Sequence, residues 1–158
     1  MIKILPLNKN NFNPKNKYFL VVSIGYGEHC DDTYTKNTIE INDKQALNRK
    51  YDENGFPIDD EGFVDWGHYI TVKEAEHLVK FFKNILEKMD HIVLNEGIKD
   101  YRFEDELTKS EIKELKKIYN KYDDYLFYSQ IDHNWYGVVS VKIIYYDEYG
   151  ELHNCEVI

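Results

Sequence analysis

Two pairs of histidine and cysteine are the residues of this sequence best suited to bind a transition metal. His29 directly precedes Cys30, and His153 lies two residues before Cys155. Imidazole nitrogen and thiolate sulfur are ligands that zinc prefers, and four such groups complete a tetrahedral site. The short cysteine spacing of common zinc sites is absent, so we predict no metal unless the fold brings both pairs together. Otherwise the cysteines pack as small apolar side chains.

A second suggestive group is the run from Asp52 to Val72, which contains six acids and no lysine or arginine. Carboxylates attract a cationic protein surface, and aromatic rings are frequent anchors in interfaces. The predicted partner-binding residues are Asp52, Glu53, Phe56, Asp59, Asp60, Glu61, Phe63, Asp65 and Trp66. In contact with a nucleic-acid-binding partner, the carboxylates would stand where phosphates bind and the rings where bases bind.

Two other interpretations of the acidic run are simpler. The acids between residues 52 and 61 offer oxygen ligands to calcium, but Gly55 arrives two residues too early for an EF-hand loop. The acids could also be solvated turn residues that keep the protein in solution. Asn54-Gly55 and Glu61-Gly62 are turn signals, and residues 146–150 repeat the turn pattern of residues 51–55.

Catalytic motifs give no support for an enzyme. Gly25-Tyr26-Gly27 follows an expected strand but lacks the third glycine, the lysine and the following helix of phosphate-binding loops. The sequence contains no GxSxG elbow and no HExxH pair. We therefore expect a non-catalytic protein without a cofactor.

Composition narrows the class of protein further. The 158 residues include 29 acids and 20 bases, a net charge of −9, which disfavours direct binding to nucleic acid. Two cysteines fit a reduced, cytoplasmic protein, and no apolar window is long enough for a membrane span. Residues 1–158 are most simply one domain.

Two helices are predicted from apolar periodicity. Residues 71–89 place seven apolar side chains on one face, and Thr71 with Glu74 forms a capping-box start. This helix is expected to extend further if Gly97 ends it. A second, shorter helix follows Thr108, which has the same capping spacing to Glu111, and ends near residue 123.

Strands are predicted on both sides of these helices, at residues 2–5, 18–24, 34–42, 125–129, 135–146 and 151–158. Residues 44–51 are ambiguous and suit a helical turn. The strand at 135–146 carries apolar groups on both faces, as a central strand does. The predicted fold is α+β, a mainly antiparallel sheet of about five strands packed against one long and one shorter helix.

Three functions follow from these observations. The first is a small acidic protein-binding module that inhibits a basic partner such as a nuclease, the class that includes toxin-immunity proteins and phage anti-defence or anti-CRISPR proteins. The second is a metal-dependent hydrolase or metal-stabilised domain, using His68 with Asp65 or the two histidine–cysteine pairs. The third is a self-associating structural protein, in which a tyrosine-rich strand pairs as a homodimer.

Overall fold

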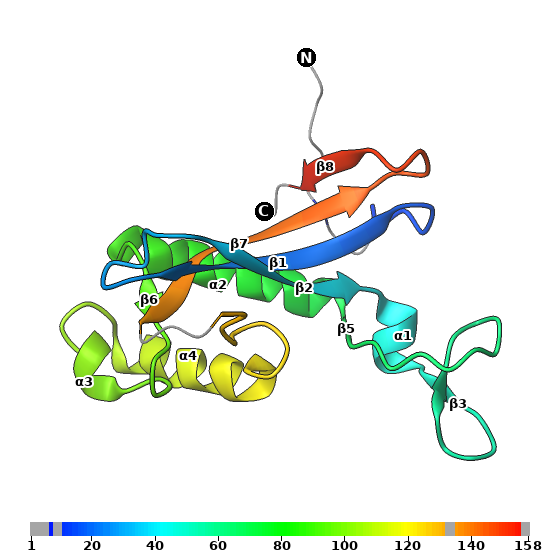
Figure 1. Cartoon of the computed structure of the whole chain (residues 1–158), viewed down its shortest axis with the longest axis horizontal. Helices are drawn as coiled ribbons and strands as arrows, with labels where there is room; N and C mark the ends of the chain where they lie inside the picture. Colours follow the sequence, from blue (N-terminus) through cyan, green and yellow to red (C-terminus); the bar gives the residue numbers. More distant parts are fainter. Residues whose placement is uncertain (1–6, 8–10, 132–134, 156–158) are drawn as a thin grey trace. The chain divides into compact units, whose positions relative to one another are not determined.

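The computed structural model describes residue 7, residues 11–131 and residues 135–155, and the strand predicted at residues 2–5 lies outside them. The described residues form an α+β protein with four helices, two of them long (Figure 1). In chain order the elements are β1 (Lys17–Tyr26), β2 (Thr35–Ile41), α1 (Asp43–Leu47), β3 (Lys50–Tyr51), β4 (Pro57–Ile58), β5 (Tyr69–Ile70), α2 (Val72–Lys88), β6 (Ile92–Val93), α3 (Asp100–Phe103), α4 (Lys109–Tyr122), β7 (Tyr136–Tyr146) and β8 (Leu152–Cys155).

The main sheet is mixed rather than purely antiparallel, and it fits the expected α+β class. Its strand order is β5-β2-β1-β7-β6, and β8 pairs with β7. β6 and β8 run antiparallel to β7, whereas β5 runs parallel to β2 with Glu40 opposite Tyr69. A parallel pair needs a long crossover connection. Residues 42–68 supply it, and they hold α1, β3 and β4.

The chain forms two compact units that are interleaved in sequence. Unit 1 holds the described residues up to Leu20, residues 39–77 and the described residues from Ile143 onward. Unit 2 holds residues 21–38 and 78–142, where described. Strands β1, β2 and β7 and helix α2 each contribute residues to both units. The single domain expected from the length stays a prediction.

The core of unit 2 confirms the apolar faces predicted for the two long helices. The side chains buried there from α2 and α4 are Leu78, Phe82, Ile85, Ile112, Leu115, Ile118 and Tyr122. The ring of Phe82 lies 5.7 Å from that of Phe127, which lies 6.3 Å from that of Tyr119. Residues 125–129 are therefore not the predicted strand. They form turns that bring Leu126 and Phe127 into this core.

The predicted helix starts are confirmed, but one predicted helix end is wrong. The Thr71 hydroxyl accepts a hydrogen bond from Glu74 N at 3.1 Å, and Thr108 and Glu111 form a complete capping box. Helix α2 ends at Lys88 and does not continue toward Gly97, because Ile92 pairs with Val138 in the sheet.

A buried amide ties β2 to the turns after α4 within unit 2. Asn37 is 1% exposed, and its side-chain nitrogen donates to the carbonyls of Leu126 and Tyr128, each at 2.8 Å. Gln130 donates its side-chain NH₂ to the side-chain oxygen Oδ1 of Asn37 and, at 3.0 Å, to the backbone carbonyl of Lys36. Every polar atom of the Asn37 side chain is therefore hydrogen-bonded, as buried polar groups require.

We expect Glu111→Ala to lower the free energy of unfolding by about 1–2 kcal/mol at pH 7, because a cap is lost. Its carboxylate accepts from Thr108 N at 2.9 Å, from Asn84 at 3.0 Å and from Lys88 Nζ at 2.6 Å. The Lys88 ammonium, followed by the Thr108 N–H, lowers the pKa of Glu111 to about 2. Because the folded-state pKa is depressed, this stabilisation is present above pH 4.5 and is lost as the pH falls through about 2.

Urea unfolding of both proteins between pH 2 and pH 7 measures this effect, with the exposed Glu87→Ala as the matched control. A stability difference that stays constant across that pH range would contradict the role given to the Glu111 charge.

Candidate functional site

The acidic run folds into a small β-meander in unit 1, which we call the meander (residues 50–66). β3 pairs antiparallel with β4, and Ile58 forms a further antiparallel bridge with Val64. Two loops join these three short segments and leave β3 next to α1 (Figure 1). The turns that the sequence predicted at Asn54-Gly55 and Glu61-Gly62 are confirmed as these loops.

Both loops of the meander are the same turn, begun by an aspartate. One carboxylate oxygen of Asp52 accepts from the backbone N–H groups of residues 54 and 56, each at 2.9 Å. Asp59 accepts from those of residues 61 and 63, also at 2.9 Å. Gly55 and Gly62 take φ values of +83° and +87°, a conformation that glycine adopts without strain. The side chains after them, Phe56 and Phe63, are therefore presented in the same way.

Large apolar side chains are unusually exposed on the meander and the helix before it. Their exposed fractions lie between 43% and 68%, and the residues are Leu47, Tyr51, Phe56, Phe63, Val64 and Trp66. The rings of Phe56 and Trp66 meet edge to face at 5.5 Å, so two of the anchors support each other. Clustered exposed apolar groups of this kind mark interaction sites more often than isolated ones do.

The carboxylates of the run are less available than the sequence suggests, because basic residues before it fold back onto it. Lys44 lies 2.9 Å from Asp60 and lowers the pKa of that carboxyl. Asp52 and Asp59 each use one oxygen in their turns. In the described part of the chain, Glu53 and Glu61 have neither a side-chain hydrogen bond nor an ion pair, and both are exposed. These two glutamates are the free carboxylates of the surface, which also carries the exposed ammonium of Lys50.

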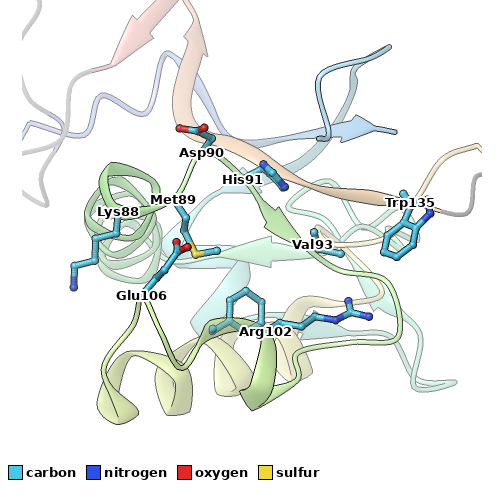
Figure 2. Close-up of a pocket in the computed structure, with 9 residues that line it drawn as sticks. Lys88, Met89, Asp90, His91, Val93, Arg102, Glu106 and Trp135 are labelled. Carbon is cyan, nitrogen blue, oxygen red and sulfur yellow. The ribbon is translucent and has the colours of Figure 1, made fainter. Parts of the chain in front are cut away.

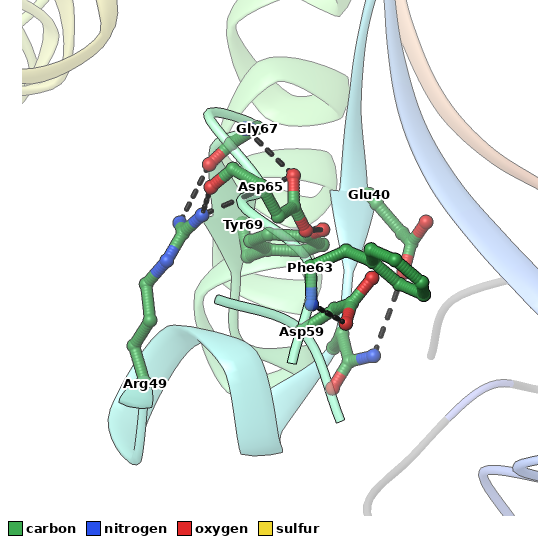
Figure 3. A network of polar contacts seen from close by, with 8 residues as sticks. Glu40, Arg49, Asp59, Phe63, Asp65, Gly67 and Tyr69 are labelled. Atoms are coloured by element: carbon green, nitrogen blue, oxygen red, sulfur yellow. Dashed lines mark hydrogen bonds and ion pairs between the residues drawn. The ribbon is translucent and has the colours of Figure 1, made fainter. Parts of the chain in front are cut away.

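Asp65 is hydrogen-bonded within a cluster at the base of the meander, which we call the clasp and which consists of Arg49, Asp65 and Tyr69 (Figure 3). Arg49 donates to the carbonyl of Gly67 at 2.6 Å and to the carbonyl of Asp65, while Tyr69 donates its hydroxyl to the Asp65 carboxylate. The Tyr69 hydroxyl, then the N–H of Gly67, lower the pKa of Asp65. Burial, together with this carboxylate, raises the pKa of Tyr69. Asp65 therefore holds the meander in position through its contacts inside the protein, and its carboxylate already has a hydrogen-bond donor.

A third aspartate turn, in unit 1, carries the residues most suited to hold a metal. Asp147 accepts from the N–H groups of residues 149 and 151, as the sequence pattern predicted. One ligating atom each of Asp147, Glu151 and His153 lie within 4.8 Å of one another, and no other such group of three occurs among the described residues. His153 Nε2 lies 2.8 Å from Asp147, and this hydrogen bond lowers the Asp147 pKa.

The sequence analysis did not identify this group, although Asp147 and Glu151 lie on opposite sides of one tight turn and His153 follows on the returning strand. The two histidine–cysteine pairs predicted as metal ligands belong to different units. His153 and Cys155 belong to β8 in unit 1, whereas His29 and Cys30 belong to unit 2. Burial raises the pKa of both thiols to about 11, so neither is a thiolate at neutral pH. A zinc site of these four residues stays a prediction.

No protein-family model, curated protein or solved structure matches the chain. Among the helices of residues 11–131 and 135–155, none is both long enough and apolar enough to cross a membrane. The feature that stands out is the meander, where exposed rings and free glutamates share one rigid surface.

Proposed function

We propose that this chain is an acidic, non-catalytic protein-binding module that inhibits a basic, nucleic-acid-binding partner. Immunity proteins of nuclease toxins and phage anti-defence or anti-CRISPR proteins are the classes in which such a module would work. The observation that carries the proposal is the meander, which exposes Phe63 and Trp66 at 67% each beside free carboxylates.

Rigid presentation is what makes the exposed rings useful as anchors. Each aspartate turn fixes the backbone on both sides of its phenylalanine, and the clasp of Arg49, Asp65 and Tyr69 fixes the end that carries Trp66. Binding then costs less conformational entropy, because the backbone that carries the rings is already held in place before the partner arrives. Aromatic side chains that fill pockets in this way dominate the energy of many interfaces.

The negative charge of this surface favours a partner with a positively charged binding face. Residues 43–70 carry seven acids and three bases, and the whole chain has a net charge of −9. Glu53 and Glu61 flank the exposed rings, and neither makes an ion pair with a described residue. A cationic cleft would be steered onto this face, and the rate of association would fall as salt screens the attraction.

Affinity capture at increasing salt tests the proposal. The immobilised protein should retain a basic, nucleic-acid-binding protein from a lysate of its native host and release it as the salt concentration rises. A variant with Glu53→Lys and Glu61→Lys should bind the identified partner at least tenfold more weakly, because two attractive charges become repulsive.

The matched control carries Glu28→Lys and Glu87→Lys, which change the net charge equally on exposed positions of unit 2. It should bind the partner with an affinity near that of the unaltered chain. Equal weakening in both variants would show that only net charge matters, and it would contradict the assignment of the meander as the binding surface.

A further inference from the structure

Unit 2 contains a pocket of about 510 Å³ at the end of α2, far in sequence from the meander (Figure 2). It is bounded by the chain that leaves α2, by β6 and by α3. The residues that line it are Lys88, Met89, Asp90, His91, Val93, Arg102, Phe103, Glu106 and Trp135. Nothing in the proposed function of the meander uses this pocket.

The apolar part of the lining suits an aliphatic chain. Phe103 is 1% exposed and so belongs to the core of unit 2, while Met89 and Val93 are partly exposed to the pocket. Trp135 adds an indole that is 48% exposed. Figure 2 shows Met89, Val93 and Trp135 around the same space as Glu106. An indole face also attracts cations, by about 0.5–2 kcal/mol.

The two basic residues in the lining are already engaged by other groups. Lys88 Nζ is held by the Glu111 carboxylate at 2.6 and 2.7 Å. Arg102 donates to the carbonyl of Asn95 at 2.8 Å and lies 3.6 Å from Glu96. These cations are therefore poor attractors for an anionic ligand.

The two carboxylates in the lining have no such partners. In the described parts of the chain, the side chains of Asp90 and Glu106 make neither a hydrogen bond nor an ion pair, and the same holds for the imidazole of His91. The charged groups of the lining that have no ion-pair partner are therefore the two carboxylates, so the pocket favours a positively charged ligand. Asp90, His91 and Glu106 do not form a close group of three ligating atoms, so the geometry does not favour a bare metal ion.

We propose that this pocket binds an organic cation, an alkylammonium or guanidinium group on an aliphatic chain. The carboxylate of Glu106 receives the charge, and Met89, Val93 and Trp135 receive the chain. Asp90 adds a second negative charge to the lining. Such a group occurs on a free amine and on a lysine or arginine side chain of a peptide. The inference stands apart from the proposed function, because it concerns a different surface.

Fluorescence of Trp135 tests this proposal in the full chain with Trp66→Phe, which leaves one of the two tryptophans. Titration with n-butylammonium and with n-butylguanidinium should give a saturable change, and 1-butanol should bind at least fivefold more weakly. Glu106→Gln together with Asp90→Asn should weaken binding of both cations at least threefold, because a charge-assisted contact is lost. Glu104→Gln together with Asp105→Asn, both at exposed positions, is the matched control and should leave binding unchanged.

The source of the cation is distinguished by a second pair of probes, acetyl-Gly-Lys-Gly-amide and the same peptide with norleucine in place of lysine. Binding of the lysine peptide alone identifies a protein side chain as the natural group, whereas binding of butylammonium but of neither peptide identifies a free amine. A response that does not saturate, equal affinity for 1-butanol, or unchanged affinity in the folded double variant would overturn the proposal. Circular dichroism confirms that each variant is folded.

Discussion

Replacing both Phe63 and Trp66 with alanine is expected to weaken binding of the basic partner at least a hundredfold without destabilising the protein. Truncation of a central aromatic anchor commonly costs 2 kcal/mol or more, and each such loss is about thirtyfold in affinity. Both side chains are 67% exposed in the free chain, so little packing is lost when they are removed beyond the contact of Trp66 with Phe56. Isothermal titration calorimetry with the captured partner measures the affinity, and thermal unfolding measures the stability.

The control for this experiment uses exposed tyrosines that do not belong to the meander. Tyr101 and Tyr149 are 64% and 83% exposed. Alanine at both positions should change the affinity less than threefold. If this control loses as much affinity as the Phe63 and Trp66 variant, or if that variant binds normally, the meander is not the binding surface.

Asn37→Asp is expected to lower the free energy of unfolding by about 3–5 kcal/mol at pH 7, although aspartate and asparagine have nearly the same shape. The amide nitrogen donates to two carbonyl oxygens at 2.8 Å, and a carboxylate oxygen there would face both carbonyls with no proton to offer. An uncompensated buried charge of this kind is strongly destabilising. Urea unfolding at pH 7 measures the change.

The pH dependence of this variant gives an independent check. Two facing carbonyls disfavour the ionised carboxyl, so its folded-state pKa lies above the usual value near 3.9. The destabilisation is therefore full at neutral pH and shrinks as acid protonates the group. Asn120→Asp on the exposed side of α4 should cost less than 1 kcal/mol. A loss of less than 1 kcal/mol at Asn37 would mean that the network does not hold the turns after α4.

The two long helices were predictable because their signals are local. Four turns of apolar periodicity and a threonine three residues before a glutamate define α2 and α4 without reference to any other part of the chain. The aspartate turns are equally local, since each needs only its own aspartate and glycine. These features depend on neighbours in sequence, so the sequence suffices to locate them.

The strands that were missed or misassigned depend on distant partners. β5 and β6 contain two residues each and show no periodicity, so only their pairing with β2 and β7 defines them. Residues 125–129 resemble a strand because they are rich in aromatic residues. They form turns instead, because the amide of Asn37 binds two of their carbonyls.

The candidate site was predicted only in part for the same reason. The acids and rings of the meander are adjacent in sequence, and they remain adjacent in the fold. The bases that neutralise Asp60 and Asp65 come from residues 44 and 49, just outside the run that the sequence marks as base-free. The sequence pattern also gives no sign that Asp65 would be enclosed by Tyr69.

The interleaving of the two units has a consequence for synthesis on the ribosome. Unit 1 draws on three separate stretches of chain, and the last of them begins at Ile143. Translation proceeds at roughly 5–20 residues per second. The first two stretches of unit 1 are therefore synthesised several seconds before β7, the strand that pairs with β1. During that interval the apolar residues of β1 lack β7 as a neighbour. The apolar residues of β1 on that side are therefore exposed in the nascent chain until β7 has been synthesised.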